Sequence, residues 1–227
     1  MTDNRFQRLK ILIGAENFSK LSSATVAIFG VGGVGSFTVE ALARSGVGHL
    51  VLIDKDNIDA TNINRQIHAL ETTVGKSKVE VMRERIKKIN PAAQVDMIQK
   101  FFSPSEIAED FFICHYDYVV DAIDTLTAKI FLVEECERRG IKIISSMGAG
   151  NKLDATRFKV SDIFQTSVDP VAKIMRKRLK DKEIKRLKVV WSDETPYPVK
   201  DFIGSAAFVP SVAGLIMAGE VVKDLIK

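Results

Sequence analysis

Cysteine is scarce in this sequence. Its 227 residues include only Cys114 and Cys136, and no CxxC pair occurs. Without such pairs the chain cannot form a four-cysteine zinc site. Because free cysteines usually pack as small apolar residues, we expect both side chains to be buried.

Long apolar runs are also missing. No stretch of about 18 consecutive apolar residues exists, so no transmembrane helix is expected. The opening residues MTDNRFQRLK lack the apolar core of a signal peptide, which favours a cytoplasmic protein. Hydrophobic residues make up 46% of the chain, and the length fits a single domain over residues 1–227. The net charge of +4 becomes informative only where the charges cluster.

A glycine-rich turn stands near the start of the chain. The apolar run ATVAIF predicts a buried strand, and Gly30, Gly32 and Gly35 then form GxGxxG, with an extra glycine at Gly33. The apolar spacing over 34–45 predicts a helix, whose positive end would face a phosphate group. The next strand, HLVLID, ends at Asp54, at the distance expected for an acid that binds a ribose. This order predicts a nucleotide-binding site.

A dense polar cluster, DKDNIDATNINRQ, follows the second strand. A dehydrogenase does not need such a cluster, because its cofactor carries the hydride chemistry. An enzyme that attacks the α-phosphate of ATP must stabilise charge on the phosphoryl oxygens, and Arg, Lys and Mg²⁺ commonly do so. Arg65 and Lys78 offer positive charge, and Asp124, at the end of a later strand, offers a ligand for Mg²⁺. Asp121 fits either a ligand or a helix partner equally well.

Strands and helices alternate through residue 146, which predicts an α/β, Rossmann-like, doubly wound and mainly parallel sheet. Residues 1–23 are expected to form an N-terminal helical arm, 24–146 the nucleotide-binding core, and 147–227 a C-terminal extension of further strands and helices. Helices after the first two strands are expected over 76–89, 103–112 and 126–139.

Positive charge is concentrated between Lys173 and Lys188. Nine lysines and arginines in this stretch are opposed only by Asp181 and Glu183, and its apolar spacing predicts a helix with one basic face. A solvated surface and a contact with RNA phosphates are both consistent with the pattern. The candidate RNA-binding residues are Arg176, Lys177, Arg178 and Lys180.

Taken together, the motifs resemble the ubiquitin-activating-enzyme-like adenylating proteins, which include the ThiF and MoeB sulfur-carrier activators. The segments that carry the resemblance are RFQRL, GVGGVGS, DKDNIDATNINRQ, GKSK and DAIDT. Two longer segments, SSMGAGNKLDATRFKVSDIFQTSVDPVAKIMRKRLK and GSAAFVPSVAGLIMAGEVVKDLI, resemble the TcdA branch of tRNA threonylcarbamoyladenosine dehydratases. The resemblance covers nearly the whole chain.

This resemblance implies an ATP- and Mg²⁺-dependent ligase that acts on threonylcarbamoyladenosine beside the anticodon of tRNA. The threonyl carboxylate would be adenylated and then cyclised, with net loss of water. It also implies a homodimer in which Arg8 reaches the ATP site of the other subunit, and residues 147–227 would bind substrate and form the dimer. The remaining implied site residues are Gly32, Gly33, Gly35, Asp54, Asp56 and Asn62 at the nucleotide, Arg65 and Lys78 at the phosphates, and Asp124 at magnesium.

Other functions remain open at this point. A relative of ThiF or MoeB would adenylate the C-terminus of a ubiquitin-like sulfur-carrier protein, and it needs a cysteine nucleophile of its own or of a partner. The expected crossover loop near Tyr197 to Asp201 contains no cysteine, which favours cyclisation by a group of the substrate itself. A sulfur-transfer or carrier partner, an NAD-dependent oxidoreductase and a non-catalytic nucleotide-binding module are the further alternatives.

Overall fold

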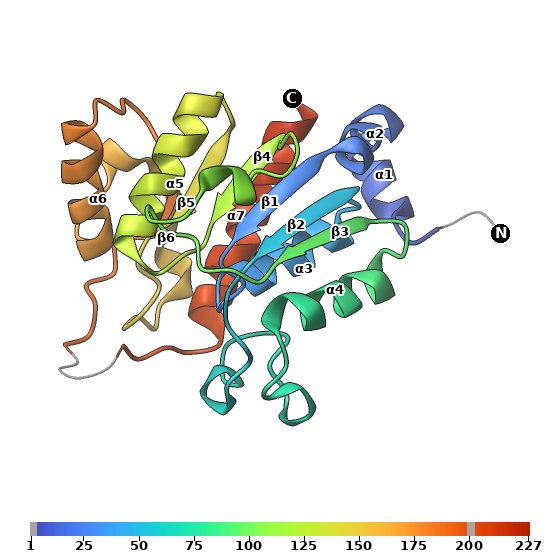
Figure 1. Ribbon diagram of the computed structural model, residues 1–227, viewed down its shortest axis with the longest axis horizontal. Helices are drawn as coiled ribbons and strands as arrows, with labels where there is room; N and C mark the ends of the chain where they lie inside the picture. The colour runs from blue at the N-terminus through green and yellow to red at the C-terminus, as the bar shows by residue number, and fades with distance from the viewer. Residues whose placement is uncertain (1–3, 199–202) are drawn as a thin grey trace.

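Seven strands form one sheet in the computed structural model, which describes residues 4–198 and 203–227 (Figure 1). The strand order is β3-β2-β1-β4-β5-β7-β6, and all neighbours are parallel except β6 and β7. This arrangement confirms the predicted α/β, mainly parallel sheet. The strands are β1 Thr25–Phe29, β2 His49–Ile53, β3 Gln94–Ile98, β4 Tyr118–Asp121, β5 Ile143–Ser146, β6 Phe158–Asp162 and β7 Lys188–Ser192.

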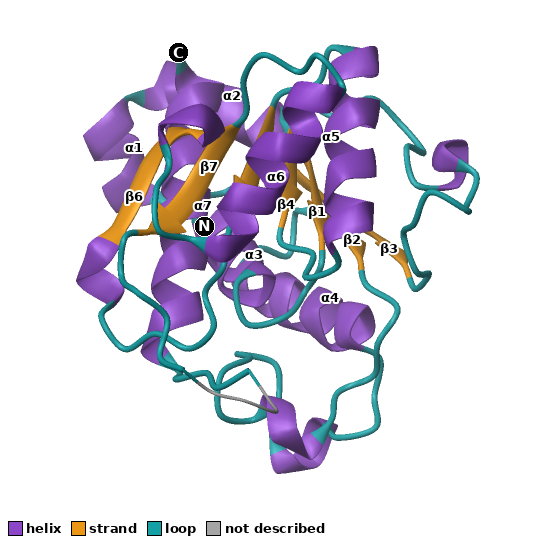
Figure 2. Ribbon diagram, turned by 90° about the vertical axis from the view of Figure 1, so that its left-hand side faces the viewer, coloured by secondary structure: helices purple, strands orange, loops and turns teal. Residues whose placement is uncertain are grey.

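Helices cover both faces of the sheet (Figures 1 and 2). Side chains of α3, α4 and α7 share one apolar cluster with β1, β2 and β4, whereas α5 and α6 pack on the other face. None of the helices in the described part is long and apolar enough to span a bilayer. The helices are α1 Gln7–Ile13, α2 Ala15–Ser23, α3 Gly35–Arg44, α4 Lys78–Ile89, α5 Leu126–Arg139, α6 Pro170–Asp181 and α7 Phe208–Ile226.

The sheet order reverses between β1 and β4, because the chain proceeds outward from β1 in one direction and from β4 in the other. Ligands of such sheets bind beyond the carboxyl ends of the strands at this reversal. Here β1 leads directly into the glycine turn, and a Cβ on Gly30 would lie only 2.6 Å from the carbonyl oxygen of Ala122. Gly30 also has φ +89°, so a side chain at this position would be strained as well as crowded.

The helix predicted over 103–112 is wrong. Only a single 3₁₀ turn, Ala108–Asp110, forms there. The segment instead buries its aromatic side chains individually: Phe102 and Phe111 pack edge to face, with ring centroids 5.0 Å apart. The expected burial of Cys114 is wrong for the same reason, because this irregular segment leaves Cys114 exposed, whereas Cys136 on α5 is buried as predicted.

One further boundary differs from the prediction. The basic helix ends at Asp181 and does not reach Lys188, which begins β7. The turn between them passes through Glu183 at φ +58° and buries Ile184. Part of the expected crossover loop, 199–202, lies outside the described residues, as do 1–3 of the N-terminal arm.

Close packing of α7 on α3 generates a test of this fold. A Cβ on Gly214 would overlap the carbonyl oxygen of Val34, at the start of α3. We therefore expect Gly214→Ala to lower the free energy of unfolding by about 1–3 kcal/mol. Gly219→Ala, on the same helix, is the control: nothing lies within 4 Å of its Cβ, and the variant should be neutral or up to about 1 kcal/mol more stable. Urea unfolding measures both, and equal stability of the two variants would contradict this packing.

Candidate active site

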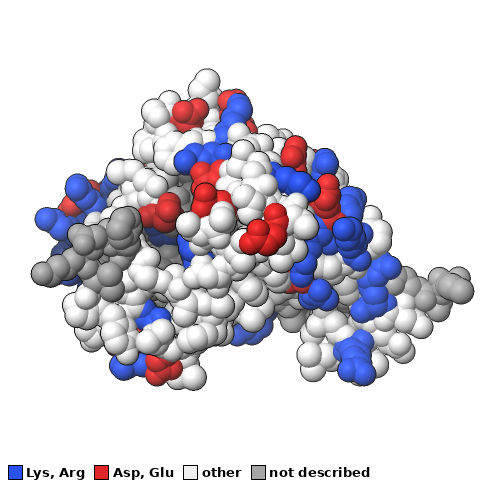
Figure 3. Space-filling view, turned by 90° about the horizontal axis from the view of Figure 1, so that it is seen from below, with Lys and Arg blue, Asp and Glu red and all other residues white. Residues whose placement is uncertain are grey.

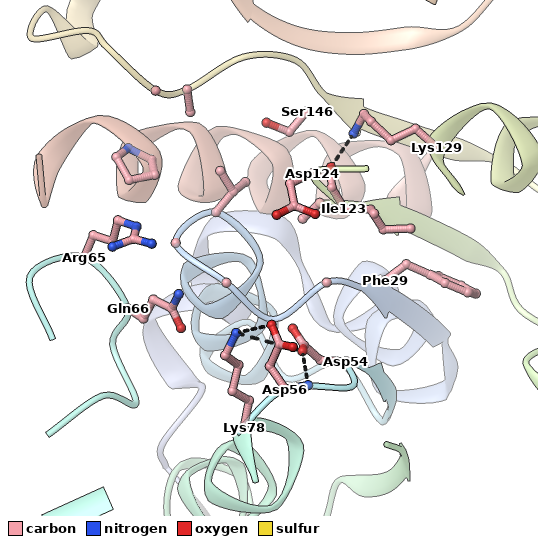
Figure 4. Close-up of a pocket in the computed structure, with 18 of the residues that line it drawn as sticks. Phe29, Asp54, Asp56, Arg65, Gln66, Lys78, Ile123, Asp124, Lys129 and Ser146 are labelled. Carbon is pink, nitrogen blue, oxygen red and sulfur yellow. Dashed lines mark hydrogen bonds and ion pairs between the residues drawn. The ribbon is translucent and has the colours of Figure 1, made fainter. Parts of the chain in front are cut away.

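A cavity of about 530 Å³ lies at the reversal of the sheet, beyond the carboxyl ends of β1, β2 and β4. Residues from the glycine turn, the polar cluster and the end of β4 meet around it, although they are far apart in the sequence (Figure 4). The predicted site residues that line the cavity are Gly32, Gly33, Asp54, Asp56, Asn62, Arg65, Lys78 and Asp124.

Asp54 fixes the glycine turn to the end of β2. Its carboxylate accepts a 2.7 Å hydrogen bond from the Val31 amide and a 2.9 Å bond from the Asp56 amide. The predicted acid is therefore held against the turn that should receive the phosphates. Gly35, also predicted to contact nucleotide, is not among the lining residues. Its Cβ would overlap the carbonyl oxygen of Gly30, so its role is to let α3 start close to β1.

Lys78 is the first residue of α4, and only 5% of its surface is exposed. A lysine at this end of a helix opposes the helix dipole, so its position needs compensation. Two acids supply it: the Lys78 ammonium lies 3.0 Å from Asp56 and 4.0 Å from Asp54 (Figure 4). Burial opposes ionisation of Asp56, but hydrogen bonds from Lys78 and Lys55 outweigh it and hold the pKa of Asp56 below its ordinary value.

Arg65 and Asn62 come from the loop between β2 and α4. Asp59 caps the short 3₁₀ helix Ala60–Asn62, which begins this part of the loop. The Arg65 guanidinium then donates 2.8 Å to the carbonyl oxygen of Thr61 and 3.0 Å to the Asn64 side chain. In Figure 4 the guanidinium lies across the cavity from Asp124, on the same side as Gln66. Arg65 and Asp124 therefore lie on opposite walls of the cavity.

Asp124 is exposed to the cavity just beyond β4. The described residues contain no group of three or more His, Cys, Asp or Glu side chains that could hold a metal ion. A lone carboxylate still suits Mg²⁺, which typically takes one or two carboxylates together with substrate phosphates and water. Asp121, the other candidate, is fully buried and 2.9 Å from Lys129, so it acts as a partner inside the protein.

Lys129 is a site residue that the sequence prediction missed. It lines the cavity from the first turn of α5, and its ammonium donates 3.0 Å to the carbonyl oxygen of Ile123, next to Asp124. The pair with Asp121 thus fixes the backbone that carries Asp124. A usable signal was present, because Lys129, like Lys78, is a lysine in the first turn of a predicted helix.

His68 is a second missed residue. It is buried behind the glycine turn, with Nε2 2.8 Å from the carbonyl oxygen of Val31. Burial lowers the pKa of His68, so the neutral ring donates this bond. The backbone of Val31 is therefore held at both ends, by His68 at the carbonyl oxygen and by Asp54 at the amide nitrogen. No sequence pattern marks this pairing.

A wall of mostly small residues closes the other side of the cavity, at 146–150, and Asn151 fixes it. Asn151 has φ +57° and makes two hydrogen bonds with Gly204. The Asn151 amide donates to the Gly204 carbonyl oxygen at 2.8 Å, and the Gly204 amide donates to the Asn151 side-chain oxygen at 2.6 Å. The Tyr197 amide donates 2.7 Å to the Asn151 carbonyl. Lys152 and Asp169, a buried pair at 2.8 Å, join this wall to the start of α6.

The remaining predicted residues lie elsewhere. Arg8 is exposed on α1 and does not line the cavity of its own chain. On α6, Arg176 is half-buried and donates 3.0 Å to the carbonyl oxygen of Thr166, whereas Lys177, Arg178 and Lys180 are exposed.

A strand, glycine turn, acid and buried lysine in this arrangement can be compared with known proteins. The model of the ThiF family matches residues 6–227. This chain belongs to the ThiF family. It is 48% identical over 243 aligned residues to a Bacillus subtilis protein named tRNA threonylcarbamoyladenosine dehydratase, covering 99% of this chain and 95% of that protein. A Haemophilus influenzae protein of the same name is 44% identical over 178 residues, covering 78% and 68% of the two chains.

Solved structures give the same picture for this ThiF-family chain. The crystal structure of Escherichia coli tRNA N6-threonylcarbamoyladenosine dehydratase, TcdA, in complex with ATP matches with a TM-score of 0.92 and 36% identity. The match covers 98% of this chain and 94% of the other. The sequence-based assignment to the TcdA type is confirmed.

Proposed function

We propose that this protein is an ATP-dependent tRNA threonylcarbamoyladenosine dehydratase. The observation that carries the proposal is the buried Lys78 ammonium, held by two acids beside a glycine turn in a chain that matches ATP-bound TcdA over nearly its whole length. In this reaction the threonyl carboxylate of the modified adenosine attacks the α-phosphorus of ATP. A carboxylate–phosphorus bond forms, the bond to the β-phosphate breaks, and pyrophosphate leaves.

The cavity residues divide this first step among them. The amides of Gly32 and Gly33 face the phosphates, and Asp54 holds the ribose. Lys78 and Arg65 stabilise the negative charge that builds on the phosphoryl oxygens, with Asn62 as an amide donor. The apolar side chains of Phe29, Phe101 and Phe102 on the cavity wall suit the adenine ring.

The second step needs no nucleophile from the protein. A group of the threonylcarbamoyl moiety attacks the activated carbonyl, a ring closes, and AMP leaves with one oxygen of the original carboxylate. Positioning then replaces covalent catalysis. Neither cysteine lines the cavity: Cys136 is buried in α5, where burial raises the pKa of its thiol, and Cys114 lies in the 103–117 segment. This placement supports cyclisation over the sulfur-carrier alternative.

Asp124 is proposed to hold Mg²⁺, which would neutralise phosphate charge as pyrophosphate leaves. The exposed carboxylate of Asp124 in the cavity supports this assignment. We expect Asp124→Asn to raise the Mg²⁺ concentration that half-saturates AMP release by about tenfold or more. Thermal unfolding serves as a control for folding, and an unchanged Mg²⁺ requirement would remove Asp124 from the metal site.

Transfer RNA is the proposed substrate carrier, and the exposed cations of α6 are proposed to contact its phosphates. The buried Lys152–Asp169 pair ties the start of this helix to the cavity wall, which supports a common binding surface. Of the four candidates, Lys177, Arg178 and Lys180 are exposed and available, whereas Arg176 is engaged with Thr166.

The test of this function is AMP release from ATP with three additions: tRNA carrying threonylcarbamoyladenosine, tRNA lacking it, and no tRNA. We expect AMP only with the modified tRNA, because only that tRNA presents the carboxylate. Replacing both Lys177 and Lys180 with Gln should raise KM for tRNA several-fold and leave kcat unchanged. AMP formation that responds to a carrier protein and to no tRNA would instead support the sulfur-carrier alternative.

A homodimer is also proposed, with Arg8 completing the ATP site of the partner subunit. Helix α1 supports this arrangement, because none of its residues is buried in the single chain and Ile11 and Leu12 are 77% and 79% exposed. An apolar helix surface of this kind is typical of an interface. An arginine supplied from a second subunit would stabilise phosphate charge in the same way as Arg65.

Mixing two inactive variants tests this arrangement. We expect Arg8→Ala and Lys78→Ala each to lose ATP-dependent turnover while keeping the wild-type fold by circular dichroism. After subunit exchange, a mixed dimer contains one site with both changes and one intact site, so activity should recover to about a quarter of the wild-type value. No recovery, despite mixed dimers seen by native mass spectrometry, would place Arg8 in its own subunit's site, and an active Arg8→Ala variant would remove it from the reaction.

A further inference from the structure

A second cavity, of about 450 Å³, lies away from the active site, where the N-terminal residues meet the last turns of α3 and α4. Cationic side chains dominate it. Its lining residues are Arg5, Phe6, Arg44, Arg85, Lys88 and Ile89. These residues are spread over more than 80 positions of the sequence, so no motif marks the site.

One buried carboxylate organises the arginines of this cavity. Glu40 of α3 accepts 2.6 Å from Nε and 3.1 Å from Nη2 of Arg85, and 2.7 Å from Nε of Arg44. The Glu40 side chain is 8% exposed. Burial opposes its ionisation, but the bonds from Arg85 and Arg44 outweigh it and hold the pKa of Glu40 below its ordinary value. The carboxylate therefore stays charged, fixes the plane of the Arg85 guanidinium through two bonds and holds Arg44 through one.

The cavity nevertheless remains positive. Arg44, Arg85 and Lys88 carry three positive charges and Glu40 carries one negative charge, so these four groups have a net charge of about +2. Arg44 bonds Glu40 through Nε alone, so the two terminal nitrogens of Arg44 take no part in this contact. The Arg44 side chain is 60% exposed. The helix dipole favours a basic residue at the C-terminal end of each helix. It does not explain why the ends of α3 and α4 and the N-terminal segment bring their basic residues to one cavity.

We infer that this cavity binds a backbone phosphate of the tRNA substrate. The inference rests on the proposed function. Arginine guanidinium groups held in a fixed plane are suited to the paired oxygens of a phosphate. Phe6, an aromatic side chain of this lining, already packs against Phe18, with ring centroids 5.4 Å apart. The contact is therefore to the RNA backbone and carries no base preference.

Helix α4 links this cavity to the active site. Lys78, at its first residue, lines the ATP cavity, and Lys88, in its last turn, lines the second cavity. At 1.5 Å per residue the two positions are about 15 Å apart along the helix axis. In Figure 3, Lys and Arg side chains gather on the right-hand side of the molecule. A polyanion that places one nucleotide in the active site can reach this distance, whereas a free phosphate cannot bridge it.

The salt dependence of tRNA binding tests this inference. The test variant carries Arg44→Gln and Lys88→Gln, and Arg85 remains to neutralise Glu40. The control carries Lys142→Gln and Lys227→Gln, which remove the same charge from exposed positions outside both cavities. We expect the test variant to bind modified tRNA roughly tenfold more weakly at low salt, and the slope of log Kd against log salt to fall by about 0.7–0.9 for each lost phosphate contact. The control should match the wild type, and both variants should bind ATP normally.

Three outcomes decide the question. Equal Kd values and salt slopes for test and control variants would overturn the inference. Tighter binding of inorganic phosphate by the wild type than by the test variant, with tRNA binding unchanged, would also overturn it and assign the cavity to a free anion. Failure of the proposed function looks different: modified tRNA would then give no AMP with the wild-type enzyme, whatever the binding slopes of the variants.

Discussion

The close approach of the glycine turn to β4 determines where chemistry can take place in this protein. Gly30 lies against the backbone of Ala122, and any side chain there would force β1 and β4 apart. These are the two strands between which the sheet order reverses, so their spacing sets the width of the cavity. His68 and Asp54 hold the same turn through the backbone of Val31, His68 at the carbonyl oxygen and Asp54 at the amide. The active site therefore depends on a backbone contact before it depends on any charged side chain.

Two lysines stand beside this turn in positions that destabilise their helices, and a neighbouring aspartate compensates each of them. Lys78 and Lys129 both stand in the first turns of helices, where the dipole disfavours a positive charge. Each is buried and paired with an aspartate: Lys78 with Asp56, and Lys129 with Asp121. The first pair presents an ammonium to the cavity, and the second fixes the loop that carries Asp124. Phosphate binding would use the first lysine, and the second has a positioning role.

The sequence was sufficient for the features that depend on local pattern. The strands, the glycine turn and most helices have periodicity or spacing that needs no tertiary information, and they were predicted correctly. The 103–112 segment failed because burial of Phe102 and Phe111 decided its path, and the helix propensity of the segment did not. The arginine cavity was also beyond prediction: Glu40 and Arg44 are neighbours on α3, but Arg85 joins them only when α4 packs beside α3.

The central claim is that an acyl-adenylate of the tRNA-borne carboxylate forms in the first cavity, and oxygen transfer tests it most directly. Modified tRNA would be prepared with oxygen-18 in the threonyl carboxylate, and the AMP released in one turnover would be analysed by mass spectrometry. Attack of that carboxylate on the α-phosphorus predicts one labelled oxygen in the AMP and one left in the cyclised nucleoside. Unlabelled AMP, or release of ADP and labelled phosphate, would contradict the account, because the carboxylate would then never have been bonded to the α-phosphorus.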